Sequence, residues 1–204
     1  MFDPALRRLK DRLLDPLARG LPGVPPLALT GAALVLGLAS AYAAWHGRFG
    51  LALTLWLGNR VFDGLDGAVA RMHGKASDLG GFLDLVADFV VYGTIPAALA
   101  LRPGAHPALA GAAVVLLVAF YVNTVSWTVA SALLEKRARG AAPNPSPTSV
   151  TIPEGLVSGG ETILFYTLFF LLPEHQLSLF YAMAGLTAIT VAQRVAWATS
   201  VFRD

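Results

Sequence analysis

Six apolar segments, each close to the length that crosses a bilayer, most strongly limit how this chain can fold. A helix needs about 20 consecutive apolar residues to span the hydrocarbon core. The chain is 55% hydrophobic and only 14% charged, which is outside the usual range of soluble domains. We therefore expect residues 1–204 to form one all-α membrane domain, a six-transmembrane-helix bundle. The expected spans are Leu27–Trp45, Gly50–Val69, Leu79–Leu101, Ala108–Leu134, Ile152–Leu172 and Leu177–Ser200.

The distribution of basic residues predicts the orientation of these spans. If the N-terminus is cytoplasmic, only Arg48 and Arg102 lie on the outer side, as the positive-inside rule requires. We expect a multi-pass protein of a bacterial or archaeal cell membrane, and a formal net charge of +2 gives no reason to expect nucleic acid as a partner. The cytoplasmic basic residues would then be Arg7, Arg8, Lys10, Arg12, Arg19, Arg71, Lys75, Lys136, Arg137, Arg139 and Arg203.

Residues 1–24, before the first span, have the pattern of an amphipathic helix. Apolar residues recur at helical spacing against a basic face, which favours a helix lying on the inner leaflet over a solvated one. The apolar positions are Phe2, Leu6, Leu9, Leu13, Leu14 and Leu17.

The start of the fifth span is predicted from its capping residues. Thr151, Pro153 and Glu154 fit an N-cap, a first-turn proline and a capping-box carboxylate. A helix that began near Glu161 would have too few apolar residues before Pro173 to cross the bilayer. We therefore expect Glu161 to lie within the membrane.

Four aspartates interrupt the second and third spans. On a helix, Asp63 and Asp66 lie on one face of the second span, and Asp84 and Asp88 share a face of the third. The two spans run antiparallel, so all four carboxylates are expected at one level, about one to two turns inside the cytoplasmic boundary. A fifth aspartate, Asp78, reads as the solvated N-cap of the third span.

Buried carboxylates at this depth require a positive partner. Each ionised aspartate costs about 2.5–3.5 kcal/mol in a spanning helix, and like charges repel. Only Arg60 and Arg71 can approach, whereas oxygen ligands suit Mg²⁺ or Mn²⁺. Two such ions about 3.5–4 Å apart would form a site for phosphoryl transfer. The alternatives are a polar cluster of protonated carboxylates that only joins helices, an intramembrane cation transporter and a metal-dependent prenyltransferase.

The spacing of these residues resembles the signature of the CDP-alcohol phosphotransferase family. An upstream Pro-Asn-x-x-Thr stretch found in many members is only partly present, with Pro26 and Thr30 but Leu27 in place of asparagine. The signature occupies residues 62–90 and reads Asp63-x2-Asp66-Gly67-x2-Ala70-Arg71-x8-Gly80-x3-Asp84-x3-Asp88.

The resemblance implies transfer of a phosphoalcohol group from a CDP-linked donor, here CDP-diacylglycerol, to the hydroxyl of a small alcohol, with release of CMP. By motif position, Asp63, Asp66 and Asp84 would hold one divalent ion, and Asp63, Asp84 and Asp88 a second. Asp88 would also be the general base. Members of the family are commonly dimers, so a homodimer is possible.

The same resemblance assigns Gly67, Arg71 and Ser77 to the CDP moiety, with Arg71 as a phosphate partner. The simpler alternatives are a positive-inside anchor for Arg71 and an ordinary loop serine for Ser77. The acceptor alcohol is open among serine, glycerol phosphate, inositol phosphate and others.

Three polar residues of the later spans are candidates for the acceptor pocket, because ionisable groups in spans are usually functional. They are Asn123, Glu161 and Arg194. A structural ion pair between Glu161 and Arg194 is an equal alternative.

Overall fold

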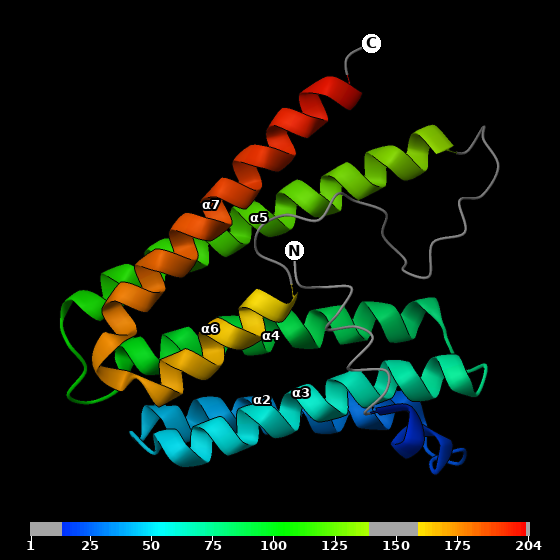
Figure 1. The fold of residues 1–204 in the computed structure, drawn as a ribbon, viewed down its shortest axis with the longest axis horizontal. Coiled ribbons are helices and arrows are strands. Elements are labelled where there is room, and N and C mark those ends of the chain that lie inside the picture. Colours follow the sequence, from blue (N-terminus) through cyan, green and yellow to red (C-terminus); the bar gives the residue numbers. More distant parts are fainter. Residues whose placement is uncertain (1–13, 139–158, 203–204) are drawn as a thin grey trace.

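The computed structural model describes residues 14–138 and 159–202, and the regular structure in these ranges is entirely helical (Figure 1). Residues 14–19 form a short helical segment before the bundle. The bundle consists of α2 (Pro26–Trp45), α3 (Phe49–Met72), α4 (Asp78–Leu101), α5 (Ala108–Ala138), α6 (Gly159–Leu171), the 3-10 turn η1 (Pro173–His175) and α7 (Gln176–Val201).

Four helices of the described ranges are long and apolar enough to cross a membrane, namely α2, α4, α5 and, together with η1, α7. This confirms an all-helical membrane protein, while the count of six spans stays a prediction. Helix α3 has 24 residues, but its charged residues reduce its apolar character. Helix α6 has only 13 described residues, which is about 20 Å of helix against a core of about 30 Å.

Apart from the fifth span, the predicted limits of the spans agree closely with the ends of the helices.

The two predicted helix caps have different outcomes. The cap at Thr151 and Pro153 lies outside the described residues. The prediction that Asp78 caps the third span is wrong, because Ser77 has the extended backbone and its Oγ accepts a hydrogen bond from the Gly80 amide at 3.1 Å. Asp78 is instead the first residue of α4, where a carboxylate favours the positive end of the helix dipole.

The segment before α2 packs on the bundle at its described end. Leu14 and Ala18 are buried with Leu29 of α2 and Leu65 of α3. Leu17 remains 53% exposed. The predicted apolar face at residues 2–13 lies outside the described residues, so an interfacial helix stays a prediction.

Helix α2 is the centre of the first half of the bundle, because it packs along both α3 and α4, whereas α3 and α4 contact each other only slightly. The three helices come close together at Gly37, where an added β-carbon would overlap the Val91 side chain of α4 and come within 3.2 Å of Asn59 Nδ2 of α3. Glycine therefore sets how near these helices come to one another.

Helices α5 and α7 pair along their length and lie beyond α4 and α6 from α2 and α3 (Figure 1). An aromatic core joins α3 to α6 and α7. Its ring centroids are separated by 5.0 Å for Trp56 and Tyr166, 5.2 Å for Tyr166 and Phe169, and 4.7 Å for Phe169 and Phe180. All four side chains are fully buried.

The contact at Gly37 predicts an effect on stability. We expect Gly37→Ala to lower the thermal unfolding midpoint in detergent, because overpacking against the stiff Val91 side chain costs about 1–3 kcal/mol. The control is Gly31→Ala on the same helix, where an added β-carbon meets nothing within 4 Å. Equal midpoints for the two variants would contradict the close packing of α2 on α4.

Candidate functional site

The predicted carboxylates lie on α3 and α4, which flank α2. Asp66 is 4% exposed, and Asp63, Asp84 and Asp88 are partly buried. The connection between the two helices is tethered to the segment before α2. Lys75 Nζ donates to Pro22 O at 2.6 Å, and His73 Nε2 lies 2.9 Å from Ala18 O. These bonds hold together the end of the bundle that carries the acidic residues.

Asp63 and Asp88 approach each other at a shared arginine. Arg60 Nη2 donates to Asp88 Oδ1 at 2.8 Å, and Arg60 Nη1 lies 3.7 Å from Asp63 Oδ2. The side chains are 19% exposed for Asp63 and 25% for Asp88, so both remain accessible to a ligand. The structure thus brings one acid from each helix to a common cation.

Arg60 is itself held by side chains of both helices. Its Nε donates to Asn59 Oδ1 at 2.7 Å, and its Nη1 donates to Tyr92 Oη at 2.8 Å. The guanidinium carbon lies 4.7 Å from the centroid of Trp56 and 5.2 Å from that of Tyr92. Hydrogen bonds and aromatic faces therefore fix the guanidinium in position.

Asp66 has a different partner from Asp63, although both lie on the same face of α3. Thr30 Oγ1 of α2 donates to Asp66 Oδ2 at 2.5 Å. The threonine of the partial Pro-x-x-x-Thr stretch thus orients one of the predicted metal ligands. This role was not part of the sequence prediction, because it depends on how α2 lies against α3.

The chemistry of the donor set fits a hard divalent cation, since all four predicted ligands are carboxylates. Within residues 14–138 and 159–202, no three acidic or histidine side chains are gathered closely enough to count as a ready-made metal site. The joint placement of Asp63 and Asp88 is therefore shown, whereas ligation by all four aspartates stays a prediction.

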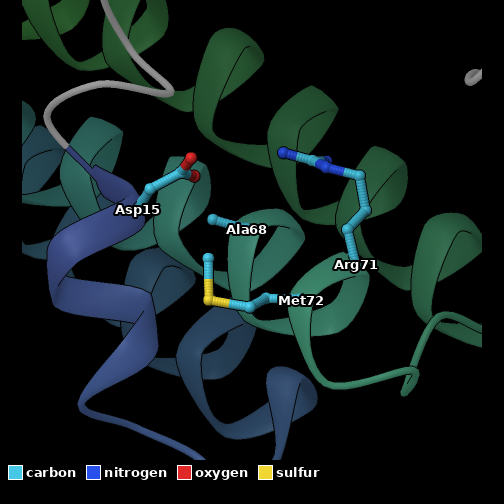
Figure 2. A pocket seen from close by; sticks show the side chains of 4 residues that line it. All are labelled: Asp15, Ala68, Arg71 and Met72. Carbon is cyan, nitrogen blue, oxygen red and sulfur yellow. The ribbon is translucent and has the colours of Figure 1, made fainter.

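A hollow of about 330 Å³ lies beside the end of α3 and is lined by Asp15, Ala68, Arg71 and Met72. Figure 2 shows Asp15 and Arg71 on opposite sides of it, with Ala68 and Met72 between them. Gly67 lies next to Arg71, and an added β-carbon would be 3.0 Å from Arg71 Nη1, so a larger residue would require the guanidinium to shift. Arg71 thus lines an open space, as a phosphate partner would require.

For two further residues, the structure shows something that the sequence did not predict. Asp15 was not predicted, because only the packing of residues 14–19 against α3 brings it to the hollow. Ser77 is exposed, and its hydroxyl accepts the hydrogen bond that caps α4. Any contact of Ser77 with a nucleotide remains a prediction.

The candidate acceptor residues fall into two groups. Arg194 of α7 contacts Asn123 of α5, with Nη1 donating to Asn123 Oδ1 at 2.9 Å and to Ser126 Oγ at 2.5 Å. This arginine therefore bonds to α5 rather than to Glu161, which lies in the first described turn of α6. Arg194 Nε is buried and has no hydrogen-bond partner.

The sequence of residues 24–202 matches the CDP-alcohol phosphatidyltransferase family. The inner membrane protein YnjF of Escherichia coli (strain K12) is 37% identical over 152 residues, which are 74% of this chain and 72% of that protein. The CDP-diacylglycerol–serine O-phosphatidyltransferase of Helicobacter pylori (strain ATCC 700392 / 26695) is 33% identical over 75 residues, or 37% of this chain and 32% of that enzyme. This second likeness covers about a third of the enzyme's length.

Two solved structures share the fold. Both are phosphatidylinositol phosphate synthase (PgsA1) of Mycobacterium tuberculosis. The crystal structure with CDP-DAG bound gives a TM-score of 0.67 at 22% identity and covers 91% of this chain and 92% of that chain. The complex with manganese and citrate gives 0.62 at 20% identity, with coverage of 90% and 87%.

One conclusion follows from the extent of the family match, the relative at 37% identity and the four aspartates on α3 and α4. The chain belongs to the CDP-alcohol phosphatidyltransferase family and is a membrane-embedded transferase of phospholipid biosynthesis.

Proposed function

We propose that this chain transfers a phosphatidyl group from CDP-diacylglycerol to the hydroxyl of a small alcohol, with release of CMP, at a site of two divalent ions between α3 and α4. The observation that carries this proposal is the convergence of Asp63 and Asp88 on Arg60, within a largely apolar bundle. Together these three groups retain one net negative charge, which favours an added cation over a closed salt-bridge cluster. The family match gives no support to the transporter or the prenyltransferase alternative.

The metal ligands in this proposal are Asp63, Asp66 and Asp84 for one ion, and Asp63, Asp84 and Asp88 for the other. Either Mg²⁺ or Mn²⁺ suits these oxygens, and the manganese complex of PgsA1 supports the choice of a divalent ion. When bound, the ions would neutralise charge on the diphosphate of the donor. Thr30 orients Asp66 through its 2.5 Å hydrogen bond.

The chemical step needs a base on the acceptor side. The acceptor oxygen forms a bond to the phosphorus that carries the diacylglycerol, and the bond from that phosphorus to the CMP oxygen breaks. Asp88 takes the proton of the acceptor hydroxyl, because it is the last carboxylate of the stripe and is 25% exposed. Arg71 and the hollow beside it hold a phosphate of the CDP moiety, next to Gly67 and Ser77.

The wider arrangement follows from the basic residues. We propose that α3 and the helix containing α6 complete six spans, that the N-terminus and the site face the cytoplasm, and that residues 1–204 act as one domain. Asn123, Glu161 and Arg194 are proposed to line the acceptor pocket. Two copies of the chain are proposed to associate in the membrane.

The proposed reaction predicts release of CMP. Purified protein supplied with Mg²⁺ or Mn²⁺, CDP-diacylglycerol and a panel of alcohols is expected to release CMP with one acceptor. We expect Asp88→Asn to reduce the rate by about 10²–10⁴-fold, because an amide cannot take the acceptor's proton. The control is Asp78→Asn, an exposed aspartate of the same helix, which should keep the wild-type rate. Full activity of Asp88→Asn would refute the assignment of the base.

The proposed ions predict a requirement for divalent metal. Exhaustive chelation should abolish CMP release, and added Mg²⁺ or Mn²⁺ should restore it, because the carboxylates need cations before they can accept a diphosphate. The same treatment should leave the helical content unchanged by circular dichroism, since the apolar packing does not involve metal. An enzyme that stays active after chelation would exclude a metal-dependent mechanism.

The hollow predicts a role for Arg71 in donor binding. We expect Arg71→Lys to raise the KM for CDP-diacylglycerol and to lower kcat/KM by a factor corresponding to about 1.5–3 kcal/mol, because lysine cannot form the paired hydrogen bonds of a guanidinium. Arg48→Lys, an exposed arginine at the opposite end of α3, should match wild type. A change confined to the KM of the acceptor would assign Arg71 to the other substrate.

A further inference from the structure

We propose that Arg60 is a positioning residue of the carboxylate site, which holds Asp88 and Asp63 in the orientation that binds a divalent ion. The inference rests on the proposed function, because it concerns the same metal site. It assigns a role to a residue that precedes the family signature at residues 62–90.

The guanidinium of Arg60 has partners on every side, and they lock it independently of any ligand. Asn59 holds its Nε, Tyr92 holds its Nη1, and the rings of Trp56 and Tyr92 lie against it. These partners are themselves anchored. Asn59 Nδ2 donates to Ala33 O of α2 at 2.8 Å, and Tyr166 Oη of α6 donates to the Tyr92 carbonyl at 2.6 Å. Arg60 is therefore part of the rigid core and not a surface cation that can swing away.

Arg60 contacts one acid on its own helix, Asp63, and one across the space between α3 and α4, Asp88. The hydrogen bond to Asp88 uses Oδ1 only, so the carboxylate keeps a second oxygen for a metal ion. On α3, Asp63 Oδ2 lies 3.7 Å from the same guanidinium. Without this shared cation, the two carboxylates would repel each other and take separate rotamers. Because Arg60 already holds the side chains of Asp63 and Asp88 in place, a metal ion that binds them would cause a smaller loss of their conformational freedom.

Outer partners of metal ligands usually have a measurable effect. Loss of a side chain that orients a ligand weakens metal affinity or activity by about 10–100-fold. A lysine at position 60 keeps the positive charge near the metal site but cannot bond Asn59, Tyr92 and Asp88 at once. The substitution Arg60→Lys therefore separates orientation from the simple presence of a cation.

The test is titration of the purified protein with Mn²⁺ in the absence of substrates, followed by electron paramagnetic resonance of the free ion. We expect Arg60→Lys to weaken Mn²⁺ binding by about 10–100-fold. The Mn²⁺ concentration for half-maximal CMP release should rise by a similar factor, whereas the KM for CDP-diacylglycerol at saturating Mn²⁺ should stay near wild type. A purely structural role for Arg60 would not shift the metal dependence in this selective way.

Arg102 provides the matched control. Its guanidinium also lies on an aromatic ring, 5.1 Å from the centroid of Phe49, and its Nη1 donates to Gln176 Oε1 at 2.9 Å, but it is at the opposite end of α4. Arg102→Lys should therefore lose comparable packing without any change in Mn²⁺ affinity. If Arg60→Lys cannot be isolated folded, Tyr92→Phe removes the phenol that accepts from Nη1, and a weaker affinity is again expected.

The outcomes separate this inference from the function on which it rests. Wild-type affinity or tighter binding of Mn²⁺ in Arg60→Lys would overturn the positioning role, as would unchanged affinity in Tyr92→Phe where that variant is used. Asp84→Asn serves as the reference for loss of the metal site itself. If wild type binds Mn²⁺ and Asp84→Asn does not, the proposed site stands whatever the result at Arg60. If wild type binds no Mn²⁺, both proposals fail.

Discussion

Carboxylates inside an apolar helix bundle are the constraint on which the arrangement of this protein depends. An ionised aspartate costs about 2.5–3.5 kcal/mol in a spanning helix, and the structure gives these acids specific partners. Asp88 and Asp63 face Arg60, and Asp66 accepts a hydrogen bond from Thr30. The single charge of Arg60 cannot neutralise two carboxylates, which is the charge argument for the cations in the proposed function.

Helix α2 fixes the positions of the residues that form the candidate site. It supplies Thr30 to Asp66 and the Ala33 carbonyl to Asn59, which in turn holds Arg60. Its Gly37 allows close packing against Val91 of α4. Because α3 and α4 both pack on α2 and touch each other only slightly, the space between them is bridged by side chains. In the proposed function, these side chains lie beside the diphosphate and its counterions.

The positions of the helices and the face that carries the acids could be predicted from the sequence, because apolar length and helical periodicity are local properties. The predicted second span, Gly50–Val69, lies within α3, and the third, Leu79–Leu101, differs from α4 by one residue. The choice between Ser77 and Asp78 as the cap could not be predicted, because both side chains can accept the hydrogen bond and only the backbone conformation separates them.

Contacts between helices were less predictable for a physical reason. Whether Arg60 reaches Asp88, or Thr30 reaches Asp66, depends on the rotation and spacing of helices that are set by packing at residues such as Gly37. Arg60 could be predicted to approach the acids, but its contacts with Tyr92, Trp56 and Asn59 could not. Asp15 was missed for the same reason, because only the packing of residues 14–19 against α3 brings it to the hollow beside Arg71.

The polar groups of α5 and α7 lie on different helices from the acidic residues of α3 and α4. Arg194, Asn123 and Ser126 form their own cluster between α5 and α7, with one buried nitrogen of Arg194 left without a partner. The carboxylates and Arg71 belong to α3 and α4, which carry the family signature. In the proposed function, an acceptor pocket on α5 and α7 could therefore change between members of the family without disturbing the residues assigned to the CDP-linked donor. In this proposal, the separation accounts for a signature that identifies the reaction but not the alcohol.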